Sequence, residues 1–307
     1  MTGSWHMNEG RLVHSNDQCL QIDAASWSGP FSPELQDQAT AALEAGRVIV
    51  LPHLPFQVEA EERTLLTPAT SSGERKNVSF DPKTGKIGNV ALEPAEASRL
   101  LAMLDRFGRE ATRLVSELLP NYASALERAR TSFRPSEIMD RSYSPRHDDR
   151  LLHVDAFPTR PLHGRRILRV FSNVAPDASV RAWRVGEPFH DFARKFLPRV
   201  RGPLPGTAAL LATLGLTKGR RSPYDHIMLS LHDAGKLDSD YQKTAPSFGL
   251  DFASGSTWLC FTDQVLHAAM AGHCALEQTF HVPVEVMADP ARSPLRVLEQ
   301  LTGRSLV

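Results

Sequence analysis

The stretch RLLHVDAFP, residues 150–158, places a histidine and an aspartate two positions apart in an apolar segment. In an extended strand, residues two apart point to the same face, so His153 and Asp155 would project side by side. A carboxylate in an apolar strand is costly unless it is paired or binds a metal. The stretch therefore predicts a strand that carries part of a metal site, a hydrogen-bonded polar pair, or two polar residues on a solvated face.

The bulk properties are those of an ordinary globular protein. Its 307 residues are enough for one large domain or two smaller ones. The formal net charge is zero, so no overall field attracts nucleic acid, which we exclude as a partner. Three cysteines do not make a disulfide framework, and the longest apolar run, 207–216, is too short to span a bilayer. With no secretory signal at the start, we expect a cytoplasmic protein.

The texture of the chain changes near residue 130, from helical to strand-rich. We expect a leader over residues 1–34 and a single domain over 35–290. Within that domain, 35–130 would give helical support and 131–290 a β core. Residues 291–307 would form a C-terminal tail or helix. Several short strands behind a helical part predict an α+β protein with a β-sandwich or barrel.

Capping and breaking residues define the expected helices. Ser32, Pro33 and Gly46 suit the two ends of one helix, and RVIVLP (47–52) reads as the strand after it. A long helix is expected from about Pro94, because apolar residues recur at steps of three and four. These residues are Leu100, Leu104, Phe107, Ala111, Leu114 and Leu118. Pro120 should break this helix, with a resumption in NYASALERART; the apolar stripe should pack against a sheet.

The expected strands follow residue 130, with turns and one mixed segment, 186–246, between them. The strand-like runs are LLHVDAFP (151–158), RILRVFSNV (166–174), STWLCFT (256–262), VLHAAMAG (265–272) and ALEQTFHVPVEVM (275–287). His226 and His232, inside the mixed segment, are expected to line a surface or a substrate region.

A metal site at His153 and Asp155 needs a third ligand. Two histidines and one carboxylate form the facial triad that holds Fe(II) and leaves coordination positions open. His267, in another apolar strand-like run, is the best third ligand, with His273 and His281 as rivals. The alternative is that His267 is a half-buried histidine with an ordinary hydrogen bond. A second H-x-D, His147 to Asp149, reads as a solvated loop.

The strand after this stretch adds a cation. Ile167, Arg169, Phe171 and Asn173 share one face of RILRVFSN. If that face holds the metal, the Arg169 guanidinium would bind the far carboxylate of a dicarboxylate co-substrate as a bidentate fork. The alternative is a surface salt bridge from an edge strand.

Longer blocks carry a more specific signal. They are LLHVDAFPTRPLHGRRILRVFSNVAP (151–176), RAWRVGEPF (181–189), SPYDHIMLSLHDAGKLDSDYQ (222–242) and STWLCFTDQVLHAAMAGHCALEQTF (256–280). In these blocks the chain resembles the Kdo 3-hydroxylase family of Fe(II)/2-oxoglutarate-dependent dioxygenases, where Kdo is 3-deoxy-D-manno-oct-2-ulosonic acid. The resemblance covers about residues 35–290. It implies a double-stranded β-helix core, jelly-roll and cupin-like, flanked by N-terminal helices.

The resemblance also implies roles for particular residues. His153, Asp155 and His267 match the catalytic iron ligands. Arg169, with Phe171 beside it on the same strand face, sits where some branches of the superfamily bind 2-oxoglutarate. Many members carry Arg or Lys about ten residues after the distal histidine, where this chain has Gln278. Gln278 would therefore assist Arg169, unless Arg166 or Arg184 supplies the positive charge.

The reaction implied is hydroxylation of Kdo at carbon 3 by Fe(II), 2-oxoglutarate and O2, which gives the sugar Ko. The implied substrate is a Kdo-bearing lipid A precursor of lipopolysaccharide. Two alternatives remain open: a related dioxygenase with another substrate, and a cupin-like sugar-binding protein without oxidative chemistry.

Several basic segments could meet an anionic, lipid-anchored substrate. Residues 194–221 join basic residues to a short apolar run, so they could lie on the inner-membrane surface or form a core helix with solvated ends. The loop ERKNVSFDPKTGK (74–86) could be a lid or a plain surface loop. Arginines that flank the H-x-D stretch could bind a carboxylate or a phosphate, or be ordinary surface residues; they are Arg141, Arg146, Arg160 and Arg165.

Overall fold

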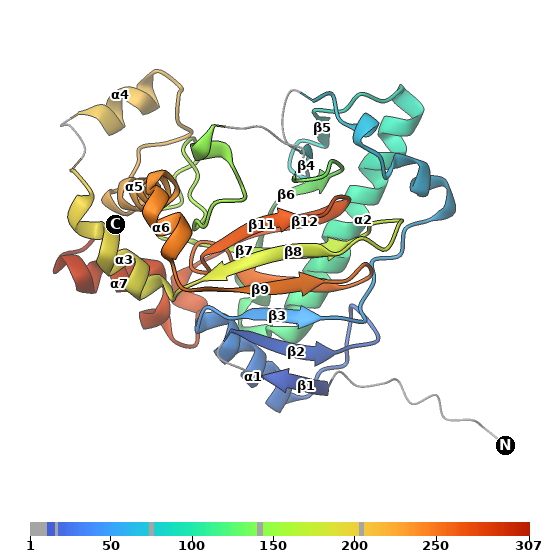
Figure 1. The fold of residues 1–307 in the computed structure, drawn as a ribbon, viewed down its shortest axis with the longest axis horizontal. Coiled ribbons are helices and arrows are strands. Elements are labelled where there is room, and N and C mark those ends of the chain that lie inside the picture. The colour runs from blue at the N-terminus through green and yellow to red at the C-terminus, as the bar shows by residue number, and fades with distance from the viewer. Residues whose placement is uncertain (1–10, 16–17, 74–76, 140–143, 203–205) are drawn as a thin grey trace.

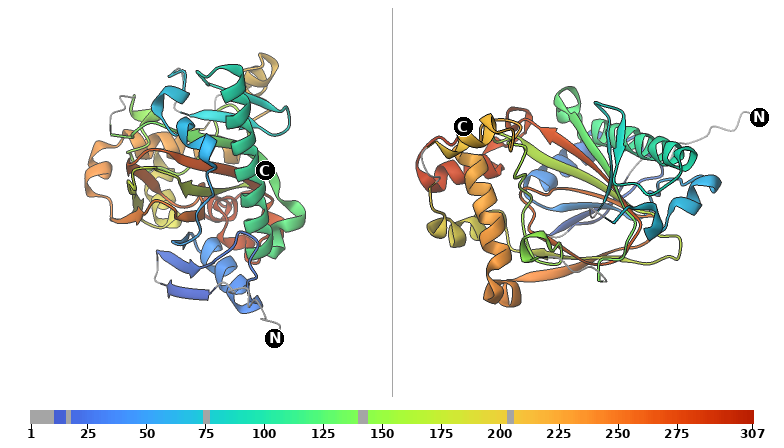
Figure 2. Two further views of the ribbon diagram at one scale, coloured as in Figure 1. Left: turned by 90° about the vertical axis from the view of Figure 1, so that its right-hand side faces the viewer. Right: turned by 90° about the horizontal axis from the view of Figure 1, so that it is seen from above.

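The computed structural model describes residues 11–15, 18–73, 77–139, 144–202 and 206–307. In this part of the chain, two β-sheets are accompanied by seven α-helices (Figures 1 and 2). The large sheet has the strand order β1-β2-β3-β10-β7-β12-β6-β4-β5, and the small sheet has the order β11-β8-β9. All pairings are antiparallel except that of β2 with β3. The expectation of an α+β protein is confirmed at the level of class, and the larger sheet is mainly antiparallel.

The strands of the large sheet are β1 (Arg11–Ser15), β2 (Cys19–Asp23), β3 (Val48–Leu51), β4 (Val78–Asp81), β5 (Lys86–Gly88), β6 (Glu127–Arg134), β7 (Arg166–Asn173), β10 (Thr257–Phe261) and β12 (Ala275–Val282). Those of the small sheet are β8 (Arg181–Gly186), β9 (Ser247–Phe252) and β11 (His267–Ala271). The helices are α1 (Pro33–Glu44), α2 (Pro94–Leu118), α3 (Phe189–Phe196), α4 (Thr207–Thr213), α5 (Pro223–Leu237), α6 (Ser239–Thr244) and α7 (Pro294–Thr302).

The two sheets pack face to face around an aromatic cluster. Trp258 of the large sheet stacks on Phe171 and on Phe252, with ring centroids 5.2 and 3.9 Å apart. Trp183 of the small sheet meets Phe171 edge-on at 5.0 Å. Buried aromatic rings contribute large apolar areas and favour these stacked and edge-to-face geometries. The cluster therefore fixes the spacing of the sheets on which the site described below is built.

The two helices expected in the first half are confirmed. The Ser32 side chain accepts a hydrogen bond from the Leu35 N–H at the start of α1, and Gly46 follows its end with φ of 80°. The apolar stripe of α2, from Leu100 to Leu118, is fully buried and packs on the large sheet. The stripe is therefore part of the core, as expected.

Two local expectations are wrong. The chain does not resume a helix after Pro120: a 3-10 turn, Pro120–Ala125, leads into β6, whose pairing with β4 and β12 overrides its helical propensity. Residues 151–158 are irregular, and only His153 pairs, as an isolated bridge with His267. The segment 186–246, for which the sequence showed mixed signals, contains the helices α3 to α6.

The N-terminal end of the chain differs from expectation, whereas the C-terminal end is a helix, one of the two forms expected for it. Strand β2 lies inside the span read as a leader, yet it pairs with β3 in the large sheet. Helix α7 buries Leu295 and Leu298 in the main core, so the C-terminal segment is a packed helix. Part of the expected loop 74–86 is the hairpin β4–β5; residues 74–76 lie outside the described residues. Among those described, no helix combines the length and apolarity needed to cross a bilayer.

Candidate metal centre

Two segments that are far apart in the sequence hold the candidate ligands together. His153 and His267 exchange backbone hydrogen bonds in both directions, at 3.1 and 2.9 Å. The Asp155 N–H donates to the Thr262 carbonyl at 2.8 Å, which fixes the irregular segment to the loop before β11. His153 and Asp155 thus lie beside the first residue of β11 without forming a regular strand.

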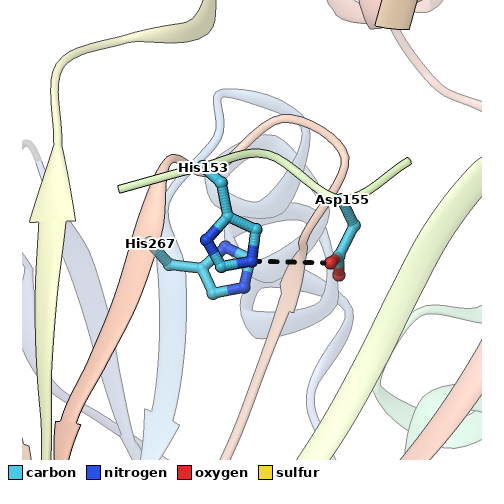
Figure 3. Close-up of side chains that lie close together, drawn as sticks. All are labelled: His153, Asp155 and His267. Atoms are coloured by element: carbon cyan, nitrogen blue, oxygen red, sulfur yellow. Dashed lines mark ion pairs between the residues drawn. The ribbon is translucent and has the colours of Figure 1, made fainter. Parts of the chain in front are cut away.

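Hydrogen bonds orient both imidazoles toward a common space. The Nδ1 atoms of His153 and His267 each contact a backbone carbonyl, of Leu151 at 2.7 Å and of Val265 at 2.9 Å. This leaves the Nε2 atoms as the ligand atoms, and His153 Nε2 lies 3.9 Å from Asp155 Oδ1 (Figure 3). One ligand atom from each of the three residues lies within 4.8 Å of the other two. Only this group, among the described residues, could hold a metal ion through three or more such side chains.

Burial and neighbouring charges give these groups the protonation states that a metal requires. Burial lowers the pKa of His153 and of His267, so both imidazoles are neutral. Burial would raise the pKa of Asp155, but the nearby Arg169 guanidinium holds it well below its usual range. Neutral imidazoles and an ionised carboxylate are the forms that coordinate divalent metals.

The residues present therefore fit Fe(II). Asp155 Oδ2 is buried and accepts no hydrogen bond from the described residues, although Arg169 Nη2 is 3.2 Å away. A buried carboxylate oxygen that accepts no hydrogen bond is uncommon, and it is free to bind a cation. Two imidazole nitrogens and one carboxylate are the donor set of non-heme Fe(II) sites. The rival histidines lie elsewhere: His273 is beside Glu137 and Asp177, and His281 is beside Phe157.

A small cavity of about 50 Å³ adjoins the three ligands. Phe171 and Trp183 form an aromatic wall, and Trp183 stacks on His267 at 5.1 Å. The cavity is also lined by three arginines, of which the sequence indicated one: Arg134, Arg169 and Arg181. Phe171 and Arg169 thus share the cavity with the ligands, as their common strand face suggested.

A buried carboxylate ties two of these arginines together. Glu277 Oε1 lies 3.1 Å from Arg169 Nη1, and Glu277 Oε2 lies 2.6 Å from Arg134 Nη2. Arg134 also contacts Asp149 at 3.3 Å. The three guanidinium groups around the cavity are balanced by three carboxylates: Asp149, Asp155 and Glu277. A divalent cation and a dicarboxylate would therefore enter together without unbalancing the buried charge.

The expected contribution of Gln278 is wrong. Neighbouring residues of a strand face opposite ways, so Glu277 faces the cavity and Gln278 faces α2. Gln278 accepts hydrogen bonds from the Thr131 hydroxyl at 2.6 Å and from Arg128 at 3.3 Å.

The two substitute cations also lie outside the cavity. Arg166 is fully buried, pairs with Asp263 at 2.8 Å and lies over the Phe261 ring. Arg184 donates to Ser247 and to the backbone carbonyl of Gln242.

Other residues of the site were not identified from the sequence. Glu277 could have been found by following the strand alternation from His281. Arg134 could not, because its position depends on the pairing of β6 with β12. His232 was expected near a substrate region, and its ring lies edge-on to that of His153, at 5.4 Å. His226, by contrast, contacts the backbone carbonyl of Arg201.

The family model for 3-deoxy-D-manno-oct-2-ulosonic acid (Kdo) hydroxylase matches residues 26–305. Crystal structures of the Kdo hydroxylase KdoO, a non-heme Fe(II) alphaketoglutarate-dependent dioxygenase, are similar over 94% of this chain and 97% of that one. The complex with alphaketoglutarate and Fe(III) is 46% identical, with a TM-score of 0.91. The complex with cobalt(II) is 47% identical, with a TM-score of 0.92. No curated protein matches the chain.

Proposed function

The chain belongs to the family of Kdo hydroxylases, and from this membership we propose that it hydroxylates carbon 3 of Kdo on a lipid A precursor, giving Ko. The enzyme is a non-heme Fe(II)- and 2-oxoglutarate-dependent dioxygenase. The observation that supports this most strongly is the buried group of His153, Asp155 and His267, in which one carboxylate oxygen has no hydrogen bond from the described residues.

The two packed sheets are proposed to form the jelly-roll, or double-stranded β-helix, of this class of enzyme. Residues 35–290 would be the catalytic domain, with β2 and α7 as additions that complete its sheet and core. Sheets that pack around a ligand cavity are a recurrent architecture for such sites. The position of the three candidate ligands at the facing edges of β11 and the 153–155 segment supports this assignment.

Each group near the cavity is given a task. His153, Asp155 and His267 would hold Fe(II), which when bound couples O2 to the decarboxylation of 2-oxoglutarate and supplies the oxidant for hydroxylation. The Arg169 guanidinium would bind the far carboxylate of 2-oxoglutarate. Phe171 would cover the cavity and exclude water, because its ring is 4% exposed and packed on Trp258.

The helical end of the molecule is proposed to contact the inner-membrane surface. Leu210, Leu214 and Leu216, in and just after α4, are each more than half exposed. The same segment is joined to the loop after Asp155: the Lys218 N–H donates to the Thr159 carbonyl at 2.9 Å. Exposed leucines next to basic residues favour an anionic lipid surface. Residues 203–205 of the expected 194–221 segment lie outside the described part.

Leu214→Glu is expected to weaken binding to vesicles that contain anionic phospholipid by about tenfold or more, because burying one leucine side chain is worth about 1.5–3 kcal/mol. The measurement is cosedimentation of the purified protein with vesicles. Leu237→Glu is the matched control, since Leu237 is exposed at the end of a different helix, α5. Equal binding by both variants and the parent protein would remove α4 as the contact.

The proposed reaction is tested by mass spectrometry. Purified protein with Fe(II), 2-oxoglutarate and air should convert a Kdo-bearing lipid A precursor into a product heavier by one oxygen atom. Succinate without this product would indicate a related dioxygenase with another substrate. If neither forms although iron is bound, the protein is a cupin-like binding protein without oxidative chemistry.

A further inference from the structure

A second cavity, of about 20 Å³, begins at the other side of Asp155. Phe157, Arg160 and Arg165 line it, and Asp155 belongs to both cavities. The Phe157 ring lies 5.9 Å from the Arg169 guanidinium carbon. A group bound in this second cavity would therefore lie next to the candidate metal centre.

The face of β7 and β12 that holds Arg169 extends toward this second cavity. In β7 and β12, directly opposed residues share a face, and the pairs on the cavity side are Phe171 with Glu277, Arg169 with Thr279, and Ile167 with His281. The His281 ring lies 6.2 Å from that of Phe157. His281 Nε2 is buried and has no hydrogen-bond partner among the described residues. This imidazole nitrogen is available to a ligand at the end of the face that holds Arg169.

The carboxylates that line the second cavity already have partners. Asp155 contacts Arg169, Asp263 contacts Arg166, and Asp225 accepts hydrogen bonds from Ser222 and from the N–H groups of residues 162 and 163. They leave little capacity for another cation.

Two basic side chains that line this cavity, Arg160 and Arg165, are incompletely paired. Glu127 is shared between Arg165 and Lys83. Arg160 has no ion-pair or hydrogen-bond partner among the described residues, although it lines the cavity. Together with the neutral His281, whose pKa is lowered to about 4 by burial and then by Arg165, the region offers donors for an anion.

We propose that Arg160, assisted by Arg165 and His281, forms a subsite that binds the carboxylate of the sugar acid beside the metal centre. This inference rests on the proposed function. In a 3-deoxy-2-ulosonic acid, the carboxyl carbon is separated from carbon 3 by one carbon atom. An enzyme that presents carbon 3 to the metal must therefore hold the carboxylate a few ångströms away. A lipid phosphate has the same anionic oxygens, and the experiment separates the two.

Among the arginines that flank the H-x-D stretch, Arg160 differs from Arg146 in its surroundings. Arg146 is 59% exposed and pairs with Asp233 on the surface. Arg141 lies outside the described residues. Arg146 is therefore the matched control for Arg160: it has the same side chain and lies near in sequence, but its guanidinium is neutralised away from both cavities.

The test measures binding without O2. The ligands are a detergent-solubilised Kdo-bearing lipid A precursor, the same lipid with its Kdo carboxylate converted to a methyl ester, and a dephosphorylated form. The parent protein and Arg146→Ala should prefer the acid over the ester roughly 10- to 100-fold, the range expected for a charge-assisted contact. Arg160→Ala should lose this preference, and Arg160→Lys should restore part of it. The thermal unfolding midpoint of each variant reports whether the fold is retained.

Other outcomes overturn the inference. If folded Arg160→Ala keeps the full preference for the acid, the carboxylate binds elsewhere. If it loses only the preference for the phosphorylated lipid, the subsite takes a phosphate. If the parent protein neither binds nor hydroxylates any of these lipids, the proposed function itself is wrong. This outcome is seen in the parent protein, so it is distinct from any effect of an Arg160 substitution.

Discussion

Replacing His153 with alanine is expected to lower kcat/KM for hydroxylation by well over 100-fold and to weaken metal binding by a similar factor. Loss of a group that merely supports a metal ligand costs roughly 10- to 100-fold, so loss of a ligand should cost more. His153 Nε2 lies nearest Asp155, and its Nδ1 is hydrogen-bonded to the Leu151 carbonyl. Nε2 is therefore the atom of this side chain that serves as a ligand. The measurements are Co(II) or Fe(II) titration and product formation.

His147→Ala is the matched control for this prediction. His147 begins the second H-x-D of the chain, but it is exposed and contacts the Ser144 hydroxyl at 2.8 Å. We expect stability within about 0.5 kcal/mol of the parent protein, as for most surface changes, and unchanged metal affinity. Equal losses in the two variants would contradict the assignment, and so would tight metal binding by His153→Ala.

The three candidate ligands could be predicted from the sequence because two kinds of local information agreed. The spacing in H-x-D keeps His153 and Asp155 close whether or not the segment is a strand. His267 was chosen because it lies in an apolar run, and apolar runs of this length become buried strands. The strand predicted at 151–158 was not needed: hydrogen bonds to β11 and to Thr262 position the segment instead.

The rest of the site depends on pairings that no local pattern contains. Arg134 lies just after the stretch 121–131, where we expected a helix, and the pairing of β6 with β4 and β12 brings it to the cavity. The prediction that Gln278 assists Arg169 was wrong by one position, because strand alternation turns Glu277 rather than Gln278 toward Arg169. His232 reaches His153 from α5, a helix in a segment that showed mixed signals.

Arg169→Met is expected to lower the free energy of unfolding of the metal-free protein by about 3–5 kcal/mol, the range for breaking a buried ion pair. Arg169 is 9% exposed and contacts Asp155 and Glu277, which are both ionised in the structure. Removing the guanidinium leaves the buried carboxylates of Asp155 and Glu277 without the cation that they share, so they repel each other. Urea unfolding of the metal-free protein measures the loss, and the apparent affinity for 2-oxoglutarate should fall as well.

Arg184→Met is the matched control for stability, since Arg184 is on β8, partly exposed, and donates to Ser247 and a backbone carbonyl. A second substitution separates charge pairing from packing. If the cost of Arg169→Met comes from the unpaired Glu277 carboxylate, adding Glu277→Gln should recover part of the lost stability, because the buried charge is then removed. Arg134 would still hold the amide oxygen at this position. Additive losses in the double variant would show instead that Arg169 stabilises the fold mainly through packing of its side chain.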